Sequence, residues 1–366
     1  MLVVFRADAS LEMGSGHVMR CLTLADELKR EGHECHFICR QHDGHLGNVI
    51  VNKGHTLYLL PCMPTVSLNG HGEVENGYAN WLGAHWEQDA RQTCELISSL
   101  SVDWLVVDHY GLDFRWEQEI LKVVPELMVI DDLANRKHAC SLLLDQNLGR
   151  RVRDYCGLVP SATTLLLGPS YALLRPAFGS YRDSSIRRRA KGSMKKILIS
   201  LGGTDQSNLT GKVLDQLADV LNNQEIECDV VLGNQSPHLE SIRSKSMDLP
   251  FKTRVLVNVS DMEQLMLQAD LSIGGAGGTS WERCCMALPT LVLVLADNQL
   301  PGAKALAAQG AAVIIGTKGS DQEGLRYELN RLKRPEVLKS MSDAAASVTD
   351  GKGVFRVAQH LIRLFE

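Results

Sequence analysis

The sequence predicts an α/β protein made of two Rossmann-like domains, each a doubly wound parallel sheet. Its 366 residues exceed one ordinary core, because a domain typically holds about 100–200 residues. Short apolar segments alternate with segments of helical periodicity, as in parallel sheets covered by helices. This alternation stops over 180–196, a polar and basic stretch that resembles a solvated linker, and then restarts. We therefore expect domains over 1–180 and 195–350, and a final helix over 351–366 that packs near the domain junction.

The first half begins with a β-α-β unit. A buried strand over 2–5 leads through a glycine-containing turn into a helix over 17–30, which ends at Gly32. A second strand follows over 35–39. Later elements of this half are expected as strands at 57–60, 104–107, 127–130 and 142–144, and as a helix at 86–100.

The second half repeats this order. A strand over 197–201 ends in two glycines and is followed by a helix over 208–221. The remaining elements are expected as strands at 228–232, 254–257, 271–273, 290–294 and 312–315, with helices between most of them and a last helix at 354–365. Two such domains facing each other make a cleft, which would hold the ligand beyond the carboxyl ends of the strands.

Composition excludes several classes of protein. The net charge is −5, with 38 basic and 43 acidic residues, so we expect no nucleic-acid partner. No apolar run reaches about 18 residues and no signal peptide precedes the first strand, so we expect a cytoplasmic protein without a membrane partner. The ten cysteines include no C-x-x-C pair and suit buried thiols in a reducing compartment. A monomer is the expectation for the oligomeric state, which no motif decides.

The first motif that carries chemistry is Gly14-Ser15-Gly16-His17, between the first strand and the first helix. Glycine lets the backbone approach a ligand closely. A histidine in the first turn of a helix lies at the positive end of the dipole, which lowers its pKa and favours the neutral form that a general base needs. The alternative is a histidine that only stabilises the turn by a hydrogen bond. The placement at a strand-to-helix turn favours His17 as a base.

These glycines do not make a dinucleotide site. The fingerprint G-x-G-x-x-G needs glycine at position 19, where Met19 stands, and no acidic residue ends the second strand. The P-loop motif G-x-x-x-x-G-K-[ST] is also absent from the sequence. We therefore expect no nicotinamide cofactor.

The second motif runs from Gly274 to Glu282 and contains four glycines within five residues. It follows a strand and opens a helix, whose unpaired N–H groups and partial positive charge attract an anion. The group Gly277, Gly278, Thr279 and Ser280 would surround a diphosphate, and Glu282 would reach ribose hydroxyls. The alternative is a tight turn with an acidic residue that stabilises the helix.

The third motif is Ala296-Asp297-Asn298-Gln299, which follows strand 290–294. A carboxylate and two amides in a row suit sugar hydroxyls or N-acetyl groups, although Asp-Asn is also an ordinary turn pair. Its position one βα unit after the glycine turn favours the binding role.

Lesser clusters would edge the cleft. They are Asp108-His109-Tyr110, Asp131-Asp132, and Tyr78 with Trp81. The pair Asp131-Asp132 suits either a metal, a helix cap or an ion pair with Arg136. Because the chain holds no D-x-D motif, we favour a site without metal in which a helix terminus neutralises the leaving group.

Together these motifs resemble the UDP-2,4-diacetamido-2,4,6-trideoxy-β-L-altropyranose hydrolases of pseudaminic acid biosynthesis. The resemblance spans about residues 5 to 310. It rests on Arg6-Ala7-Asp8-Ala9-Ser10, Gly14 to Ala25, Trp81-Leu82-Gly83, Asp108-His109-Tyr110, Asp131 to Ala134, Leu144 to Asn147, Gly278 to Arg283 and Ala296 to Gln299.

The resemblance implies a GT-B fold, similar to the peptidoglycan N-acetylglucosaminyltransferase. It also implies release of UDP by inverting attack of water at the anomeric carbon, without metal or cofactor. His17 would be the base, Glu282 would hold the ribose, and Gly278 to Ser280 would hold the diphosphate. The match further places these residues in contact with the substrate: Arg6, Asp8, Gly14, Gly16, Tyr78, Gly277, Asn298 and Gln299.

Two other functions remain open at this point. A GT-B glycosyltransferase would have the same fold but would direct an acceptor hydroxyl, not water, at the sugar. A non-catalytic nucleotide-sugar binding module would bind the UDP-sugar without turnover. The mixed polarity of 41–80 offers no membrane-docking patch and therefore favours the hydrolase over a transferase to lipid.

Overall fold

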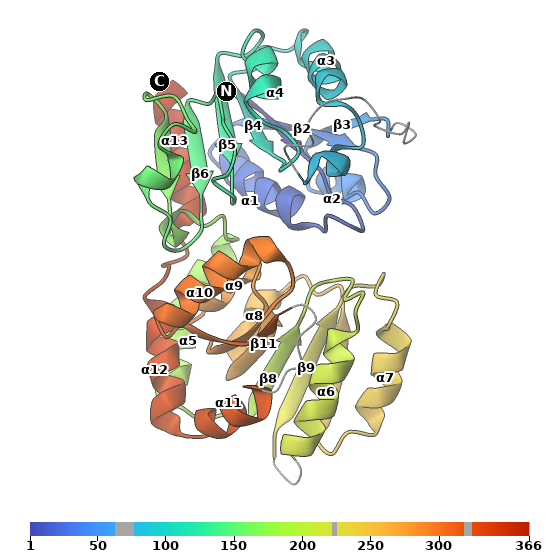
Figure 1. Ribbon diagram of the computed structural model, residues 1–366, viewed down its shortest axis with the longest axis vertical. Coiled ribbons are helices and arrows are strands. Elements are labelled where there is room, and N and C mark those ends of the chain that lie inside the picture. Colours follow the sequence, from blue (N-terminus) through green and yellow to red (C-terminus); the bar gives the residue numbers. More distant parts are fainter. Residues whose placement is uncertain (63–76, 222–224, 318–323, 366) are drawn as a thin grey trace. The chain divides into compact units, whose positions relative to one another are not determined.

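The computed structural model describes residues 1–62, 77–221, 225–317 and 324–365. It divides the chain into two compact units (Figure 1). Unit 1 comprises Met1–Leu173 and Gly353–Glu366, and unit 2 comprises Leu174–Lys352. Each unit contains its own parallel sheet covered by helices, as the alternation of apolar segments predicts.

The described part of unit 1 holds a seven-stranded parallel sheet of order β3-β2-β1-β4-β5-β6-β7. Its strands are β1 (Leu2–Ala7), β2 (Glu34–Arg40), β3 (Thr56–Leu60), β4 (Trp104–Asp108), β5 (Glu126–Ile130), β6 (Leu142–Asp145) and β7 (Thr164–Leu167). Its helices are α1 (Gly16–Arg30), α2 (Gly47–Asn52), α3 (Trp86–Ile97), α4 (Phe114–Ile120) and α13 (Gly353–Phe365), with short 3₁₀ turns η1 (Ala79–Leu82), η2 (Val152–Tyr155) and η3 (Pro169–Tyr171). The order reverses between β1 and β4, so the two strands that carry the first motif and Asp108 are neighbours.

Alternation along β1 builds two hydrophobic layers in unit 1. Val3 and Phe5 belong to one core cluster together with apolar residues of α1 and α13. Val4 belongs to another cluster, which includes Trp116 of α4 and Ala90 of α3. A strand that is apolar on both faces is what a sheet covered on both sides requires.

The described part of unit 2 holds a six-stranded parallel sheet of order β10-β9-β8-β11-β12-β13. Its strands are β8 (Lys196–Ser200), β9 (Glu227–Leu232), β10 (Lys252–Val257), β11 (Leu271–Gly275), β12 (Thr290–Val294) and β13 (Ala312–Thr317). Its helices are α5 (Pro176–Arg189), α6 (Leu209–Val220), α7 (Leu239–Met247), α8 (Met262–Gln268), α9 (Thr279–Cys285), α10 (Leu300–Ala308), α11 (Gly324–Leu332) and α12 (Pro335–Ala346), with the 3₁₀ turn η4 (Asp297–Gln299).

The polar stretch 180–196 is not a linker, and this prediction is corrected. Most of it belongs to α5, which is part of unit 2. Arg189 is buried in α5 and donates to the backbone carbonyls of Met286 and Ala269. The helix is therefore held by polar contacts to its neighbours, which an apolar period does not reveal.

The C-terminal helix α13 returns to unit 1. Its buried residues Val357 and Leu361 lie in the core cluster that also holds Leu24 of α1. Arg356 donates to the carbonyl of Ser170 at 2.8 Å. The chain therefore completes its first core with its last helix.

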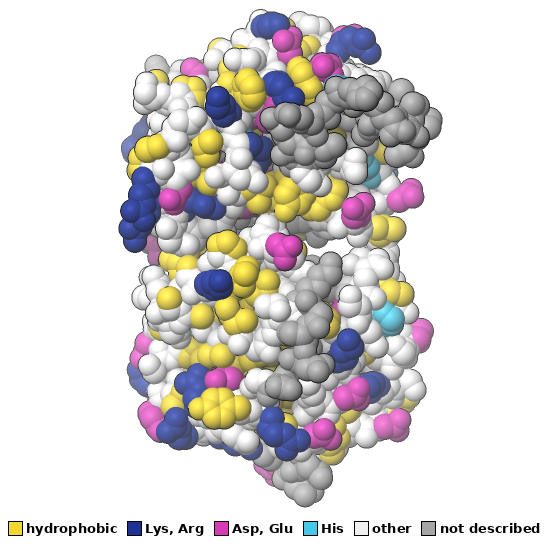
Figure 2. Space-filling model, in the orientation of Figure 1, with side chains coloured by type: hydrophobic (Ala, Val, Ile, Leu, Met, Phe, Trp, Pro, Cys, Tyr) yellow, Lys and Arg dark blue, Asp and Glu magenta, His cyan; other side chains and the backbone are white. Residues whose placement is uncertain are grey.

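Charged side chains of both signs lie interspersed on the face of the molecule that Figure 2 shows. Among the described helices, none combines the length and the apolar character needed to cross a membrane.

Candidate functional site

The first motif lies where β1 leads into α1. Gly14 has a φ of +81°, which side chains other than glycine rarely adopt. A Cβ built on Gly16 would meet nothing within 4 Å, so the backbone at the start of α1 is open to a ligand. His17 occupies the first turn of α1 and is 7% exposed.

His17 is held by Asp108 at the end of β4. The Nδ1 atom of the imidazole lies 2.6 Å from Oδ1 of Asp108. Arg20, one turn further along α1, donates to both oxygens of the same carboxylate, at 2.7 Å to Oδ1 and 2.5 Å to Oδ2. The sequence grouped Asp108 only with the residues edging the cleft, and the structure makes it the partner of the histidine.

The carboxylate of Asp108 is ionised despite full burial. Burial alone would raise the pKa of Asp108, but Arg20 and then His17 hold it well below its ordinary value. An ionised carboxylate only accepts hydrogen bonds, so Nδ1 of His17 carries the proton of this contact. In the neutral imidazole, Nε2 then has a lone pair that can accept a proton.

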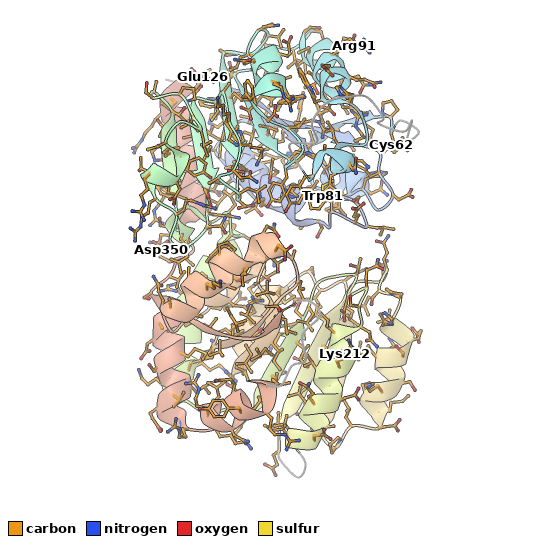
Figure 3. The ribbon with its side chains drawn as sticks, in the orientation of Figure 1. Cys62, Trp81, Arg91, Glu126, Lys212 and Asp350 are labelled. Carbon is orange, nitrogen blue, oxygen red and sulfur yellow. The ribbon has the colours of Figure 1, made fainter. Side chains whose placement is uncertain are left out.

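An aromatic cluster of three rings contacts His17 through Tyr110. The ring of Tyr110 meets the imidazole edge-on, with centroids 4.6 Å apart. Tyr78 and Trp81 pack on Tyr110 at centroid distances of 5.1 and 6.0 Å. Trp81, labelled in Figure 3, comes from η1, and Tyr110 follows β4. The structure thus brings Tyr78, predicted as a substrate contact, into the aromatic cluster around the histidine.

Asp131 and Asp132, which follow β5, have different hydrogen-bond partners. Asp132 accepts from Arg20 at 2.7 Å and from the Tyr110 hydroxyl at 2.6 Å. Asp131 pairs with Arg136 at 2.7 Å and accepts from the backbone N–H of Ala134. This is the ion-pair and capping alternative for Asp131. The described residues contain no cluster of three or more metal-ligating side chains.

The side chains of Arg6 and Asp8 lie in the interior of unit 1 and not at its surface. Both side chains are fully buried and pair with each other at 2.6 Å. Arg6 also donates to both oxygens of Asp89, which in turn accepts from Arg40. This burial leaves Arg6 and Asp8 no surface for the expected substrate contact, and their place in the structure is a supporting one.

The second motif lies in unit 2, where β11 leads into α9. A Cβ on Gly278 would meet nothing within 4 Å, and one on Gly277 would lie 3.6 Å from Nε2 of Gln299. Gln299 is fixed because its Oε1 accepts from the backbone N–H of Leu295 at 3.1 Å. The structure therefore places the third motif, in η4, directly beside the glycine turn.

Thr279 and Ser280 differ in exposure. Thr279 is exposed, whereas Ser280 is buried. Both hydroxyl oxygens accept from the guanidinium of Arg283, at 3.1 and 3.0 Å. The Ser280 hydroxyl therefore contacts the protein interior, and Thr279 is the hydroxyl of the pair that reaches the surface. The sequence motifs did not indicate that Arg283 contacts these two hydroxyls.

Glu282 is half-buried, and its carboxylate makes no hydrogen bond or ion pair with the residues that the structure describes. Burial raises its pKa to about 7, against smaller opposing effects of Arg175 and Arg283. A carboxylate that is unpaired near the glycine turn can accept hydrogen bonds from ligand hydroxyls. Asn298, in η4, is also only partly exposed.

Two other features of unit 2 are less suited to a ligand. The start of α6 is filled by Asp205, which accepts from the N–H groups of Leu209 and Thr210 at 2.9 Å. A cleft of about 600 Å³ at the amino ends of β8, β9 and β10 is lined by basic, acidic and apolar side chains. Several of these are already paired, as Lys252 is with Glu227 at 2.7 Å. The carboxyl ends of the strands remain the better candidate.

Comparison with known proteins agrees with this architecture. Residues 197–356 match the glycosyltransferase family 28 C-terminal domain. The chain is 33% identical over 375 aligned positions to the spore coat polysaccharide biosynthesis protein SpsG of Bacillus subtilis, covering 98% of the chain and 97% of SpsG. It is 26% identical to the UDP-2,4-diacetamido-2,4,6-trideoxy-β-L-altropyranose hydrolase of Campylobacter jejuni, covering 86% of the chain and 98% of that enzyme.

Among solved structures, the chain is similar to MurG of Acinetobacter baumannii. The TM-score is 0.69 at 15% sequence identity, and the match covers 99% of both chains. This likeness confirms the expected GT-B fold.

Proposed function

The chain belongs to the family of the spore coat polysaccharide biosynthesis protein SpsG, and from this premise we propose that it is a nucleotide-sugar enzyme that hydrolyses a UDP-sugar. The substrate proposed is UDP-2,4-diacetamido-2,4,6-trideoxy-β-L-altropyranose, the substrate named for the Campylobacter jejuni relative. The sequence motifs shared with such hydrolases support this assignment beyond the family itself.

The proposed reaction is the attack of water on the anomeric carbon. The water oxygen forms a bond to that carbon, and the bond from the carbon to the diphosphate oxygen breaks. The proton of the water passes to Nε2 of His17, and UDP leaves with the bonding electrons. Attack opposite to the leaving group inverts the anomeric configuration. Because UDP is a good leaving group, the reaction needs no dedicated general acid.

The single observation that carries the proposal is the pairing of His17 with Asp108. The 2.6 Å contact at Nδ1 holds the imidazole by its other nitrogen and directs the lone pair of Nε2 away from the carboxylate. This is how a histidine is prepared as a general base. Tyr110, packed edge-on against the ring, restricts its rotation further.

We assign UDP binding to unit 2. The glycine turn around Gly277 and Gly278 would hold the diphosphate, and the unpaired carboxylate of Glu282 would accept the ribose hydroxyls. Asn298 and Gln299 would contact the sugar, because η4 lies next to the turn. Replacement of Glu282 by Ala is expected to weaken UDP binding in calorimetry more than it changes the chemical step. Unchanged UDP affinity would refute the ribose assignment.

The reaction is tested by incubating the protein with the candidate UDP-sugar and no acceptor. We expect release of UDP and of a free sugar whose initial anomer, followed by NMR, has the inverted configuration. Retention of configuration, or no release of UDP without an acceptor, would contradict the proposal.

The role of His17 is tested by His17→Ala. General base catalysis typically contributes about 10²–10⁴-fold, so turnover should fall by that order while UDP still binds. His33, in the turn after α1, contacts the amino group of Met1 and not Asp108. His33→Ala is therefore a matched control that should leave turnover unchanged. A near-normal kcat in His17→Ala would remove the histidine from the mechanism.

A GT-B glycosyltransferase is the second candidate function. The match of residues 197–356 to the glycosyltransferase family 28 C-terminal domain favours it. In this case His17 would deprotonate an acceptor hydroxyl instead of water. UDP release that depends on an added acceptor would support the transferase and exclude the hydrolase.

A further inference from the structure

Arg283 is a buried cation beneath the glycine turn. It is 2% exposed and donates from Nη2 to the carbonyl of Gly275 at 2.6 Å and to the Ser280 hydroxyl at 3.0 Å. From Nη1 it donates to the Thr279 hydroxyl at 3.1 Å. Its Nε atom is buried and has no hydrogen-bond partner. The turn and the first residues of α9 are thus tied together by one guanidinium.

The positive charge of Arg283 is only weakly compensated: the adjacent Glu282 acts to raise its pKa but forms no ion pair with it among the described residues. Among the described residues, no carboxylate oxygen lies within 4 Å of its guanidinium, in contrast to Arg6 and Arg20 of unit 1, which pair with aspartates. Burial lowers the pKa of Arg283 to about 10, whereas the pKa of Arg20 is raised above its ordinary value by its acidic partners. An unpaired buried charge is costly, so its retention calls for an anion.

Arg189, a second buried arginine of unit 2, has its charge compensated in a way that the charge of Arg283 is not. Arg189 is also buried without a close acid, but it donates to the carbonyls of Ala269 and Met286, where α8 and α9 end. Carbonyls at helix C-termini carry partial negative charge and compensate a cation there. Arg283 donates to one carbonyl, that of Gly275, and otherwise contacts Thr279 and Ser280, where α9 begins and the partial charge is positive. A bound anion at the turn would compensate the remaining positive charge.

We infer that Arg283 is a positioning residue for the diphosphate of a bound nucleotide, supplying a positive charge from below the turn and orienting the Thr279 hydroxyl toward the ligand. This inference rests on the proposed UDP site. The oxygen of Thr279 accepts from Arg283, so its own proton is left to donate to an acceptor. Thr279 is exposed, and a phosphate oxygen at the turn is the acceptor that this chain of donors suits.

The glycine at position 274 is explained by the same contact. A Cβ on Gly274 would lie 2.4 Å from Nη1 of Arg283. No neighbouring side chain but the guanidinium comes so close, and Arg283 could not keep its position beside an alanine. Gly274→Ala therefore offers a second way to displace Arg283 without removing its charge.

The test compares binding of UDP with binding of uridine. Arg283→Met is expected to weaken UDP binding, measured by calorimetry, about 10-fold or more, because charge-assisted contacts to an anion are lost. Uridine binding, measured by NMR titration, should be unchanged because uridine lacks the diphosphate. Arg283→Lys should recover part of the UDP affinity, and Thr279→Val should lose a smaller part of it. Arg243→Met removes an exposed arginine of unit 2 and should leave both affinities unchanged.

Thermal unfolding separates this role from a merely structural one. The melting temperature of unliganded Arg283→Met reports the loss of the contacts to Gly275, Thr279 and Ser280, whereas the rise in melting temperature that UDP produces should be smaller than in wild type. Equal UDP-to-uridine affinity ratios in wild type and Arg283→Met would overturn the inference. If Arg283→Met does not fold, the UDP-to-uridine affinity ratios of Arg283→Lys and Thr279→Val are compared with that of wild type instead, and equal ratios would overturn the inference. If wild type itself fails to bind UDP, the proposed function fails, which is a distinct result.

Discussion

At the scale of single residues, Asp108 links the fold to the proposed chemistry. It ends β4, is fully buried, and joins His17 and Arg20 of α1 through one carboxylate. Because Arg20 neutralises it, Asp108 can remain ionised without abstracting the proton of the imidazole. The carboxylate therefore orients the histidine and leaves the transfer of the proton to Nε2.

We predict that Asp108→Asn lowers turnover by about 10-fold or more, and by no more than the loss in His17→Ala, with UDP affinity unchanged. The amide can present an N–H to Nδ1, which would favour the wrong tautomer of His17. Steady-state kinetics with UDP binding by calorimetry checks this. Asp113→Asn, which changes an N-cap of α4, is the control in the same unit. A turnover equal to wild type would show that the contact has no catalytic consequence.

The raised pKa of Glu282 predicts that the ionised carboxylate destabilises the folded protein at high pH. Its pKa is raised to about 7 in the folded protein, above its ordinary value near 4.5, so the folded state holds this proton more tightly than the unfolded state. The protonated carboxyl of Glu282 makes its full contribution to stability below about pH 4.5, and this contribution is lost as pH rises through 7. We expect Glu282→Gln to raise the free energy of unfolding at pH 8.5 by about 1–3 kcal/mol.

Urea unfolding at pH 8.5 and pH 5 checks this expectation. The gain in Glu282→Gln should shrink toward pH 5, where the wild-type carboxyl is already largely protonated. Glu240→Gln, at an exposed glutamate of α7, should show no such pH-dependent gain. A stabilisation that is equal at both pH values would contradict the shifted pKa as its cause.

The sequence alone singles out His17 and Glu282 as candidate site residues, because each follows a glycine-rich turn that opens a helix. It could not locate their partners. His17 and Asp108 are 91 residues apart, and only the pairing of β1 with β4 makes them neighbours. Arg283 is adjacent to a predicted site residue, but its direction, toward the turn and away from solvent, follows from the packing of α9 on β11.

At the scale of elements, most strands were predicted because buried parallel strands are continuous apolar runs. The helix α5 was missed, because its contacts are polar. Arg182 donates to the carbonyls of Cys285 and Ala346, and the hydroxyl of Ser185 donates to that of Met286. The short strand β7 (Thr164–Leu167) was also missed, since three leucines without a period do not distinguish a strand from a turn.

The last helix, α13, allows an element-scale prediction. Leu361 is fully buried in the core of unit 1, whereas Leu364 is 48% exposed. Leu361→Ala should lower the free energy of unfolding by about 2–5 kcal/mol, because it leaves a cavity against α1. The same substitution at Leu364 should change it by no more than about 0.5 kcal/mol. Urea unfolding of the two variants checks this, and equal losses would mean that α13 does not complete the core.

At the scale of the whole molecule, the chain divides its chemistry between two units. The proposed base, His17, belongs to unit 1, and the proposed diphosphate and ribose contacts belong to unit 2. Neither unit would be an enzyme alone.

The division also predicts how variants behave in mixtures. If the protein is a monomer, as expected, each chain must supply both its own His17 and its own Glu282. A mixture of His17→Ala and Glu282→Ala should then show only the sum of the two separate rates, measured as UDP release at limiting UDP-sugar. The double variant should lose turnover and affinity multiplicatively, because the two residues belong to separate units. A mixture faster than the sum would mean that different chains combine their units, and the monomer expectation would have to be abandoned.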